Sequence, residues 1–317
     1  MKYDVVALGE LLIDFTIDGK SSQGNNTYEA NPGGAPCNVL AMLNRMNKKT
    51  AFIGKVGKDA FGQILKSTID QIGIDSKGLV FDEKVNTTLA FVNIDENGER
   101  SFSFYRNPGA DMMLTEEEVD FEIVRNSKIF HFGTLSMTHE KVRQATKKAV
   151  EEAKKENILI SFDPNLRELL WEDLSLAKEQ IDYGCSVCDI LKIEDEELKF
   201  LTDCYEIEKA VEILKSKYDI KLILITEGSK GSTAYYKDLV IKQDAYLQKS
   251  TVDTTGAGDT YCGSCLGYLI DNSIDELNEV KIKEMISFAS AAASIVTTRK
   301  GAICSMPHPT EVEDLMC

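Results

Sequence analysis

A glycine-rich segment that ends in an aspartate, Asp253-Thr-Thr-Gly256-Ala257-Gly258-Asp259, carries the clearest chemistry in the sequence. The glycines permit backbone conformations closed to other residues and let a ligand approach the main chain. An apolar helical stretch opens at this point and ends near Ile270. The free N–H groups of its first turn would form an anion site that the helix dipole reinforces. Such a site suits the charge on a phosphoryl group in transfer.

Asp259 lies inside this turn, where a carboxylate could accept a proton from a hydroxyl group as the phosphoryl group arrives. We expect the neighbouring amides to stabilise its ionised form at neutral pH. A helix-capping function is the alternative, since aspartate is favoured in a first turn. The segment is not a Walker loop, because it lacks the Gly-Lys-Ser/Thr ending.

Composition and charge limit the classes of partner. The chain has 317 residues, of which 43% are hydrophobic and 8% aromatic, enough for a sizeable core. Its 36 basic and 52 acidic residues give a net charge of −16, which repels nucleic acid and anionic membranes. Any anionic ligand must therefore be held locally, by main-chain amides, a helix N-terminus, a divalent cation or a few basic side chains.

The start of the chain predicts a strand and not a signal peptide. Residues 1–15 lack a basic flank and a small-residue cleavage site, and Glu10 and Asp14 break the apolar run. No stretch reaches the roughly 20 apolar residues that span a bilayer, so we expect a soluble protein. Eight cysteines without dense spacing suit a reducing cytosol, which predicts a cytoplasmic location.

Two Cys-x-x-Cys pairs, Cys185/Cys188 and Cys262/Cys265, could in principle hold zinc. The pairs lie far apart in the sequence, and the three histidines add no ligand spacing. Cys262 and Cys265 also fall in an apolar helical pattern, where small thiols pack well. We therefore interpret these cysteines as packing residues.

The elements that must position these residues follow a regular order. Short β-branched runs alternate with amphipathic helical patterns, which is typical of an α/β fold with a mainly parallel sheet. The clearest unit joins a helix from Thr138 to Lys155 to a buried strand from Ile158 to Phe162. Similar units recur at 188–201 and 206–225. We expect a further strand, from Ala245 to Val252, to lead into the glycine-rich segment.

One region departs from this alternation. Residues from Thr87 to Ile94 and from Arg100 to Tyr105 predict a β-hairpin with Asn97-Gly98 as its turn. We interpret it as part of a small β lid that excludes water during group transfer; an ordinary edge hairpin is the alternative. Because no long linker is present, we predict a single domain, 1–317, with the lid formed by roughly 12–32 and 86–107.

Two separated signatures resemble the ribokinase-like, or pfkB-type, family of carbohydrate kinases. The first is Gly33-Gly34-Ala-Pro-Cys-Asn38, followed by Gly54 and Gly57, and the second is the segment from Asp253 to Asp259. The resemblance extends from Val5 to Ala302. It implies a three-layer α/β/α sandwich with a mainly parallel central sheet and a β lid. It also implies an enzyme that transfers the γ-phosphoryl group of ATP to a sugar.

The resemblance assigns the nucleotide and its phosphates to particular residues. Asp259 would deprotonate the sugar hydroxyl, and the amides of Gly256, Ala257, Gly258 and Asp259 would bind the transferred group, with Mg²⁺ on the ATP phosphates. The expected nucleotide-binding residues are Lys192, Glu197, Thr226, Gly228, Gly231 and Ser290. The segment 226–231 could equally be a plain turn between strands, which its glycine and serine content would suit.

The family match and the residue types together predict one set of sugar-binding residues. The expected sugar-binding residues are Asp14, Gly33, Gly34, Asn38, Phe104, Arg106, Asn165 and Arg167. The paired glycines would let a sugar lie against the backbone, and the polar side chains offer donors and acceptors. The alternatives are a solvated turn for Asp14, a structural cap for Asn38 and ion pairs for the two arginines.

The amino-acid sequences of three short segments favour one sugar. The segments Phe104-Tyr-Arg106, Asp163-Pro-Asn-Leu-Arg167 and Thr297-Thr-Arg-Lys-Gly-Ala302 resemble fructokinases more than ribokinases or 2-keto-3-deoxygluconate kinases. Fructose, phosphorylated at its 6-hydroxyl, is therefore the expected substrate. Ribose or 2-keto-3-deoxygluconate is the first alternative. A non-catalytic sugar-binding protein on the same scaffold is the second.

Other expectations also rest on the family. Where many relatives have Asn-x-x-Glu near Mg²⁺, this chain has Glu194-Asp-Glu-Glu197, and Ser290 stands where an asparagine often lines the adenine pocket. Metal geometry and nucleotide preference therefore stay open. The resemblance further implies a K⁺ site at Asp253, Thr255 and Ser305. It also suggests a homodimer formed through the lids, whose strand edges a second copy would cover.

Overall fold

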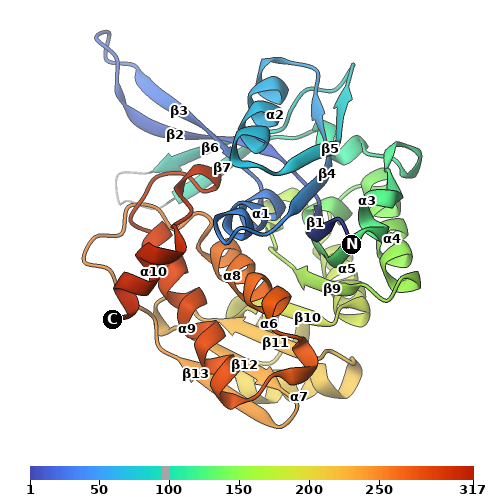
Figure 1. Cartoon of the computed structure of the whole chain (residues 1–317). Coiled ribbons are helices and arrows are strands. Elements are labelled where there is room, and N and C mark those ends of the chain that lie inside the picture. Colours follow the sequence, from blue (N-terminus) through green and yellow to red (C-terminus); the bar gives the residue numbers. More distant parts are fainter. Residues whose placement is uncertain (95–99) are drawn as a thin grey trace.

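The computed structural model describes residues 1–94 and 100–317, and a nine-stranded sheet forms its centre (Figure 1). The pairings from β11 to β5 are parallel, whereas β12 pairs antiparallel with both β11 and β13. In order across the sheet the strands are β13 (Leu239–Gln243), β12 (Ser232–Tyr236), β11 (Leu222–Thr226), β10 (Ile190–Glu194), β9 (Leu159–Asp163), β8 (Ser127–Gly133), β1 (Tyr3–Leu8), β4 (Thr50–Gly57) and β5 (Asp75–Asp82).

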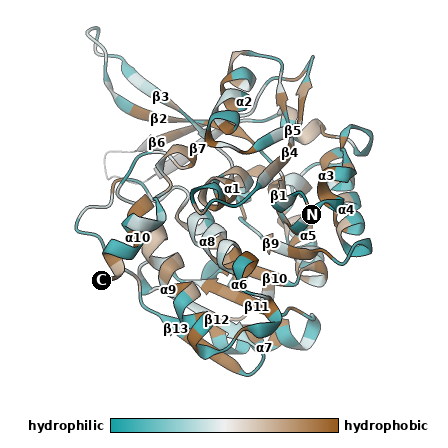
Figure 2. Cartoon of the chain, viewed as in Figure 1, coloured by the Kyte–Doolittle hydropathy of each residue, from teal (hydrophilic) through white to brown (hydrophobic). Residues whose placement is uncertain are grey.

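Helices cover both faces of this sheet, and each layer has its own hydrophobic cluster. One layer contains α1 (Ala35–Arg45), α2 (Ala60–Ile72), α8 (Ala257–Asp271), α9 (Glu279–Val296) and α10 (Pro309–Met316). The other contains α3 (Phe121–Arg125), α4 (Glu140–Lys155), α5 (Leu174–Val187), α6 (Asp195–Thr202) and α7 (Ile207–Lys217). Because both faces are covered, the central strands are strongly apolar, as the colouring of β10 and β11 in Figure 2 shows. The expected three-layer α/β/α sandwich is confirmed.

The βα units predicted from periodicity are confirmed. Helix α4 begins at Glu140, with His139 as its N-cap, and β9 follows it and ends at Asp163. The units at 188–201 and 206–225 are β10 with α6 and α7 with β11. In each case the apolar residues face one of the two clusters, which is the pattern that made the elements visible in the sequence.

A smaller four-stranded sheet stands apart from the main one, at the top of Figure 1. Its strands, in order, are β3 (Asn26–Gly33), β2 (Leu12–Lys20), β6 (Leu89–Ile94) and β7 (Arg100–Tyr105). The hairpin of β6 and β7 is antiparallel, as predicted. Its expected turn, Asn97-Gly98, lies outside the described residues. Strand β2 pairs antiparallel with β3 and parallel with β6, so the hairpin is joined to the N-terminal strands.

The predicted strand from Ala245 to Val252 is wrong. Strand β13 already ends at Gln243, and the chain then runs without regular structure to the turn before α8. Its polar groups bind α9 and the turn that follows it: Gln248 Nε2 donates to Ser294 Oγ at 2.8 Å. The amide of Val252 donates to the carbonyl of Thr297, also at 2.8 Å. These long-range partners replace the sheet pairing that local strand propensity suggested.

The two Cys-x-x-Cys pairs lie on opposite faces of the main sheet. All four thiols are buried, with Cys185 and Cys188 in the cluster below α5 and Cys262 and Cys265 in the cluster below α8. Burial raises the pKa of each of these thiols above its usual value. They are therefore neutral packing groups at physiological pH. In the described part of the chain, no helix has the length and apolar character needed to cross a membrane.

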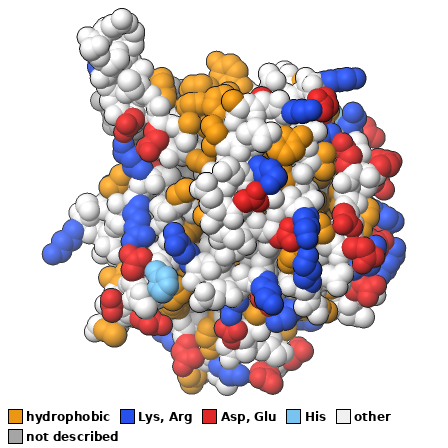
Figure 3. Space-filling model, turned by 45° about the horizontal axis from the view of Figure 1, so that its top comes forward, with side chains coloured by type: hydrophobic (Ala, Val, Ile, Leu, Met, Phe, Trp, Pro, Cys, Tyr) orange, Lys and Arg blue, Asp and Glu red, His pale blue; other side chains and the backbone are white. Residues whose placement is uncertain are grey.

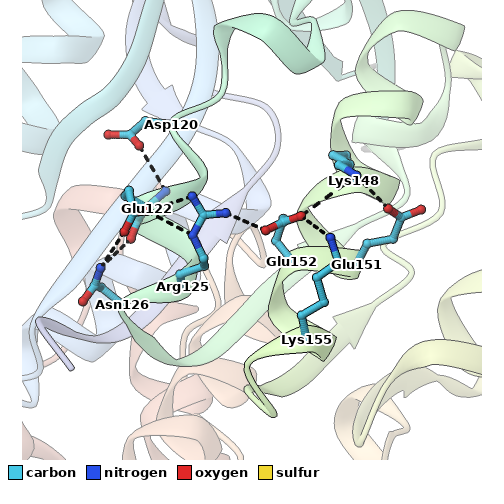
Figure 4. A network of polar contacts seen from close by, with 8 residues as sticks. All are labelled: Asp120, Glu122, Arg125, Asn126, Lys148, Glu151, Glu152 and Lys155. Atoms are coloured by element: carbon cyan, nitrogen blue, oxygen red, sulfur yellow. Dashed lines mark hydrogen bonds and ion pairs between the residues drawn. The ribbon is translucent and has the colours of Figure 1, made fainter.

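Surface charge is arranged in local networks. Figure 4 shows Arg125 of α3 between Glu122 of its own helix and Glu152 of α4, with Lys148 and Lys155 also reaching Glu152. These contacts tie the short helix α3 to α4. Because most of the partners are exposed, each pair is worth only about 0–1 kcal/mol.

Candidate active site

Two cavities meet at the N-terminus of α8. The larger cavity, of about 590 Å³, lies beside the turn after β11 and along α9. The smaller cavity, of about 440 Å³, lies between the small sheet and the main sheet. Glu194, Thr254 and Gly258 line both cavities. The predicted phosphoryl site therefore forms the boundary between two spaces of ligand size.

The first turn of α8 is shaped by Gly256, which has a φ of 79°. A Cβ atom there would lie 2.9 Å from Ala302 Cβ, so a larger residue would be both strained and crowded. The first main-chain bond of the helix runs from Thr260 N to Gly256 O at 2.8 Å. The amides of Gly258 and Asp259 precede it and have no acceptor within the helix. The Ala257 amide, which was expected to join the anion site, instead donates to Thr254 O at 3.2 Å.

Asp259 is buried in the wall of the smaller cavity. Asn38 Nδ2 donates to its Oδ2 at 2.7 Å, and Asn165 Nδ2 donates to its Oδ1 at 3.0 Å. Asn165 has a φ of 48°, a left-handed conformation that aims its amide at the carboxylate. Each oxygen is thus held by one amide, which fixes the plane of the carboxylate. Its remaining lone pairs are available to a hydroxyl group.

Burial raises the pKa of Asp259 above its usual value. Hydrogen bonds from Asn38 and Asn165 and the charges of Lys192 and Arg167 act in the opposite direction, but burial outweighs them. The expectation that the turn would favour the ionised form is therefore wrong in its net sign. A raised pKa makes this carboxyl a stronger base once ionised, which suits proton abstraction.

Asp14 and Gly34 form another part of the wall of the smaller cavity, whereas Gly33, also expected to bind the sugar, lies outside its described lining. Burial raises the pKa of Asp14 to about 7, with Arg167 acting against the shift. A Cβ atom on Gly33 would lie 2.5 Å from Asp14 Oδ2. Gly34 has a φ of 125°, and its Cβ would lie 2.4 Å from Glu10 O. Glycine at 34 lets the two backbone segments approach so closely, and glycine at 33 leaves room for the Asp14 carboxylate.

One unsatisfied hydrogen-bond acceptor belongs to a residue that lines this cavity. Asn38 lines it, and its Oδ1 is buried without a hydrogen-bond partner in the described part of the chain. Phe104, Asn165 and the exposed Arg167 complete the sequence-predicted residues in its wall. An apolar ring together with donors and acceptors is a lining that suits a small polyol.

Arg106 is placed elsewhere. Its side chain is 1% exposed, and its Nε donates to Asp111 Oδ2 at 2.8 Å. Its two terminal nitrogens donate to Thr138 Oγ1 at 3.0 Å and to Leu135 O at 2.9 Å. The described lining of the smaller cavity does not include Arg106. A buried ion pair between the strand end and the following turn therefore replaces the expected sugar contact.

Four of the expected nucleotide residues line the larger cavity: Thr226, Gly228, Gly231 and Ser290. Lys192 instead lines the smaller cavity. Glu197 lies behind both, where its two oxygens accept the amides of Leu166 at 2.6 Å and Glu194 at 2.9 Å. It therefore holds the loop of Asn165 and the start of α6 in place.

Several residues of the larger cavity were not found from the sequence. They include Tyr246, Gln248, Thr251, Tyr261 and Ser294. Tyr246, Gln248 and Thr251 belong to the segment that was wrongly predicted to be a strand. Tyr261 and Ser294 lie inside α8 and α9, whose apolar sequences indicated packing and not ligand binding. Spacing alone gave no signal for them.

The described residues contain no cluster of three or more metal-ligating side chains, so a divalent cation at the larger cavity would depend on phosphate oxygens of the nucleotide as well. Glu194, Asp195 and Glu227 line this cavity, and its described lining contains no lysine or arginine. Carboxylate oxygens are the ligands that Mg²⁺ prefers, usually together with substrate phosphates. Glu194 is the best placed of the three, because it lines both cavities and its side chain is 56% exposed.

The residues expected to hold a monovalent cation surround the turn before α8. Asp253 Oδ1 accepts both the amide and the hydroxyl of Thr255, at 3.0 and 2.7 Å. Ser305 Oγ donates to Gly301 O at 2.6 Å, and the Gly301 amide reaches Asp253 Oδ2 at 3.4 Å. The three side chains are thus tied to one loop, and the K⁺ site stays a prediction.

Comparison with known proteins identifies the family. The sequence profile described as "pfkB family carbohydrate kinase" matches residues 2–309. The chain belongs to this family. Fructokinase-2 of Solanum lycopersicum is 40% identical over 314 residues, covering 98% of this chain and 95% of that protein.

Solved structures agree with this assignment. A fructokinase with bound ATP from Xylella fastidiosa superposes with a TM-score of 0.91 at 28% identity, covering 100% of this chain and 98% of that one. A double mutant of the fructokinase from Vibrio cholerae, in fructose-, ADP- and potassium-bound form, gives a TM-score of 0.89 at 28% identity, covering 100% and 99%. This pfkB-family chain is therefore a carbohydrate kinase with the ribokinase-like fold.

Proposed function

We propose that this carbohydrate kinase transfers the γ-phosphoryl group of ATP to the 6-hydroxyl of D-fructose, giving D-fructose 6-phosphate. The observation that carries the proposal is the junction of two cavities at the N-terminus of α8, with Asp259 on the side of the smaller one. Fructokinases among the relatives support the choice of sugar, at 40% identity for the tomato protein.

In the proposed mechanism the sugar occupies the smaller cavity. Asp14, Asn38 and Arg167 bind its hydroxyl groups, and the acceptor hydroxyl faces Asp259. Asp259 takes the proton while the oxygen attacks phosphorus, so no free alkoxide forms. The amides of Gly258 and Asp259 hold the oxygens of the transferred group as charge builds on them. The small sheet closes over the sugar and excludes water.

The nucleotide occupies the larger cavity, along Thr226 to Gly231 and Ser290. Mg²⁺, when bound, supplies positive charge to the phosphate oxygens. Glu194 would hold it, with Glu197 fixing the amide of Glu194 from behind.

The substrate is tested by measuring ADP release with fructose, ribose, 2-keto-3-deoxygluconate and adenosine. We expect kcat/KM for fructose to exceed that for each of the others by at least about tenfold. A substrate that lacks one of the matching hydroxyl groups leaves a buried polar group of the site unpaired, which costs roughly 1–3 kcal/mol. Turnover with another sugar alone would contradict the fructose assignment. Sugar binding by calorimetry without any ADP release would instead indicate a non-catalytic binding protein.

Asp14 makes sugar binding depend on pH. Its pKa of about 7 means that it is protonated below neutrality and ionised above. The ionised form accepts hydrogen bonds from two hydroxyl groups, so we expect fructose affinity to rise as pH increases from 6 to 8. The measurement is the Kd of fructose by calorimetry at several pH values.

Asp14→Asn should bind fructose more weakly and lose this pH dependence. Asp18→Asn is the matched control, because Asp18 lies on the same strand but pairs with Lys300 at the surface. An unchanged pH profile in Asp14→Asn would contradict the assignment.

Three further features belong to this proposal. The chain would act as one domain, with 12–32 and 86–107 as the lid, in the cytoplasm. A second copy would cover the small sheet, where the rings of Phe15, Tyr28, Phe91 and Tyr105 contact one another and Tyr105 is 66% exposed. Figure 3 shows hydrophobic side chains gathered near the base of the projecting hairpin. A K⁺ ion would bind beside Asp253.

A further inference from the structure

The placement of the Asp259 carboxylate depends on helix α1. Asn38, the fourth residue of this helix, donates to Asp259 Oδ2 at 2.7 Å, and its own main-chain amide donates to Gly34 O at 3.0 Å. Helix α1 lies beside α8 in Figure 1, so this side-chain bond joins the starts of two neighbouring helices. A shift at the N-terminus of α1 would therefore move one of the two amides that hold the carboxylate.

The N-terminus of α1 has no side-chain cap of its own. The N-cap residue is Gly34, which has no side chain to accept a hydrogen bond, and Pro36 has no N–H to donate. The amide of Ala35 is one of the unpaired donors that every helix start must satisfy. In most helices an asparagine, aspartate, serine or threonine at the N-cap accepts such a donor. In α1 the acceptor has to come from another part of the chain.

Glu10 supplies this acceptor. Its Oε1 accepts the amide of Ala35 at 2.8 Å. Glu10 lies in the bend between β1 and β2, whereas Ala35 comes two residues after the end of β3. A Cβ atom on Gly34 would lie 2.4 Å from Glu10 O, so the bend packs directly against the start of the helix. The bond from Ala35 to Glu10 therefore closes the base of the β2–β3 hairpin, where the small sheet leaves the main body.

A carboxylate is a costly acceptor at this place. Glu10 is 4% exposed, and no ion pair to it is found among the described residues. Arg106 is near enough to lower its pKa, but the guanidinium nitrogens already bind three other groups. Burial therefore dominates and raises the pKa of Glu10 to about 7. Because Glu10 lines the smaller cavity together with Asn38 and Asp259, this cost is explained by the site and not by folding alone.

We propose that Glu10 is a positioning residue, which holds the start of α1 so that Asn38 keeps the Asp259 carboxylate aimed at the acceptor hydroxyl. This inference rests on the proposed function. In the transfer the bond from phosphorus to the β,γ-bridging oxygen breaks, the bond from phosphorus to the sugar oxygen forms, and the hydroxyl proton goes to Asp259. Glu10 exchanges no proton with the substrate. Because its bond closes the hairpin that carries Asp14, the same contact fixes this part of the small sheet relative to Asp259.

Glu10→Met tests this step, because methionine keeps the length of the side chain but is only a weak acceptor. We expect kcat to fall by about 10²-fold, the size of loss that a small misplacement of a reacting group causes. The Kd of fructose, measured by calorimetry, should stay within about threefold of the wild-type value, since the loss is confined to the transfer step. Glu10→Gln, whose amide oxygen can accept the same N–H, should recover kcat to within about fivefold of the wild type.

A double variant shows whether Glu10 acts through Asn38. Asn38→Ala removes the bond to Asp259 directly, so adding Glu10→Met should lower kcat by less than about threefold further. Each variant should also move the acid limb of kcat, at saturating sugar and ATP, to higher pH, because the bond from Asn38 lowers the pKa of Asp259. The charged groups that face Asp259 are the same in all of these variants; they are Lys192, Arg167, Asp14 and Asp163.

Asn278→Ala is the matched control for the loss of a helix cap. Asn278 accepts the amide of Lys281 at 3.0 Å, at the end of α9 that lies away from the larger cavity. This variant should lower the midpoint of chemical denaturation without changing kcat. If Glu10→Met does not fold, Ala35→Pro removes the donor of the same bond. Proline suits the first helical position, and Gly34 has the ψ of 123° that a following proline accepts, so we expect a folded protein with the same loss of kcat.

Unchanged kcat in Glu10→Met, or equal losses in Glu10→Met and Glu10→Gln, would overturn the assignment of Glu10. Losses that multiply in the double variant would show that Glu10 does not act through Asn38. A higher Kd of fructose with unchanged kcat would make Glu10 a sugar ligand instead. If the wild type phosphorylates a different sugar, only the proposed substrate fails, and the comparison is made with that sugar. If the wild type phosphorylates none, the proposed function fails and the Glu10 step with it.

Discussion

Replacing Asp259 by asparagine is expected to lower kcat by about 10³-fold, within the range that general bases contribute. The substitution keeps the shape of the side chain but removes its ability to accept a proton. Asn38 and Asn165 now donate to its two oxygens, and one of them would face an NH₂ group instead. Sugar binding should persist, so the loss should appear in kcat and not in the Kd of fructose.

The control for this variant is Asp271→Asn, at the opposite end of the same helix, where the carboxylate pairs with Lys48 at the surface. Its kcat should equal that of the wild type. Because burial raises the pKa of Asp259, the acid limb of the wild-type kcat/KM profile should lie above the pH at which an ordinary aspartate titrates. Turnover within tenfold of the wild type in Asp259→Asn would remove this residue as the base.

Arg106→Met is expected to destabilise the fold by about 3–5 kcal/mol, because it leaves Asp111 as a buried charge without its partner. The same change removes the donors to Thr138 and Leu135 O, which join the end of β7 to the turn before α4. Chemical denaturation of the wild type and the variant measures the difference in free energy of unfolding.

Two further variants show whether the ion pair is the cause. Adding Asp111→Asn to Arg106→Met should recover part of the lost stability, since no unpaired charge then remains. Arg125→Met, which removes a partly exposed arginine and leaves Glu152 paired with Lys148 and Lys155, should cost no more than about 1 kcal/mol. If Arg106→Met keeps its stability but raises the KM for fructose tenfold, the arginine contacts sugar after all.

Local patterns were enough to predict most of the architecture. The helix α4 and strand β9, like the β6–β7 hairpin, are marked by periodicity or paired runs within a few residues. The segment 245–252 could not be predicted in this way. Its backbone and side-chain partners lie on α9 and the turn after it, some forty-five residues later, and only tertiary contact reveals them.

In the active site, too, the features set by local sequence could be predicted and those set by tertiary contacts could not. The turn from Gly256 to Asp259 could be predicted from the sequence. Glycines followed by an aspartate at the start of a helix are a local signal of a tight turn with an anion site. Arg106 was misread because its partner, Asp111, becomes one only when the chain packs around both side chains. The net pKa shift of Asp259 also depends on burial, which no local pattern contains.

The smaller cavity takes its walls from both sheets. Asp14 and Phe104 come from β2 and β7 of the small sheet, whereas Asp259 and Arg167 belong to the main body. A ligand that binds to both Asp14 and Asp259 would link the small sheet to the main body, two layers that are hydrogen-bonded separately. Binding of such a ligand and docking of the two layers then share a coupling free energy. A change that weakens the docking of the layers should therefore also weaken binding, by at most this coupling free energy.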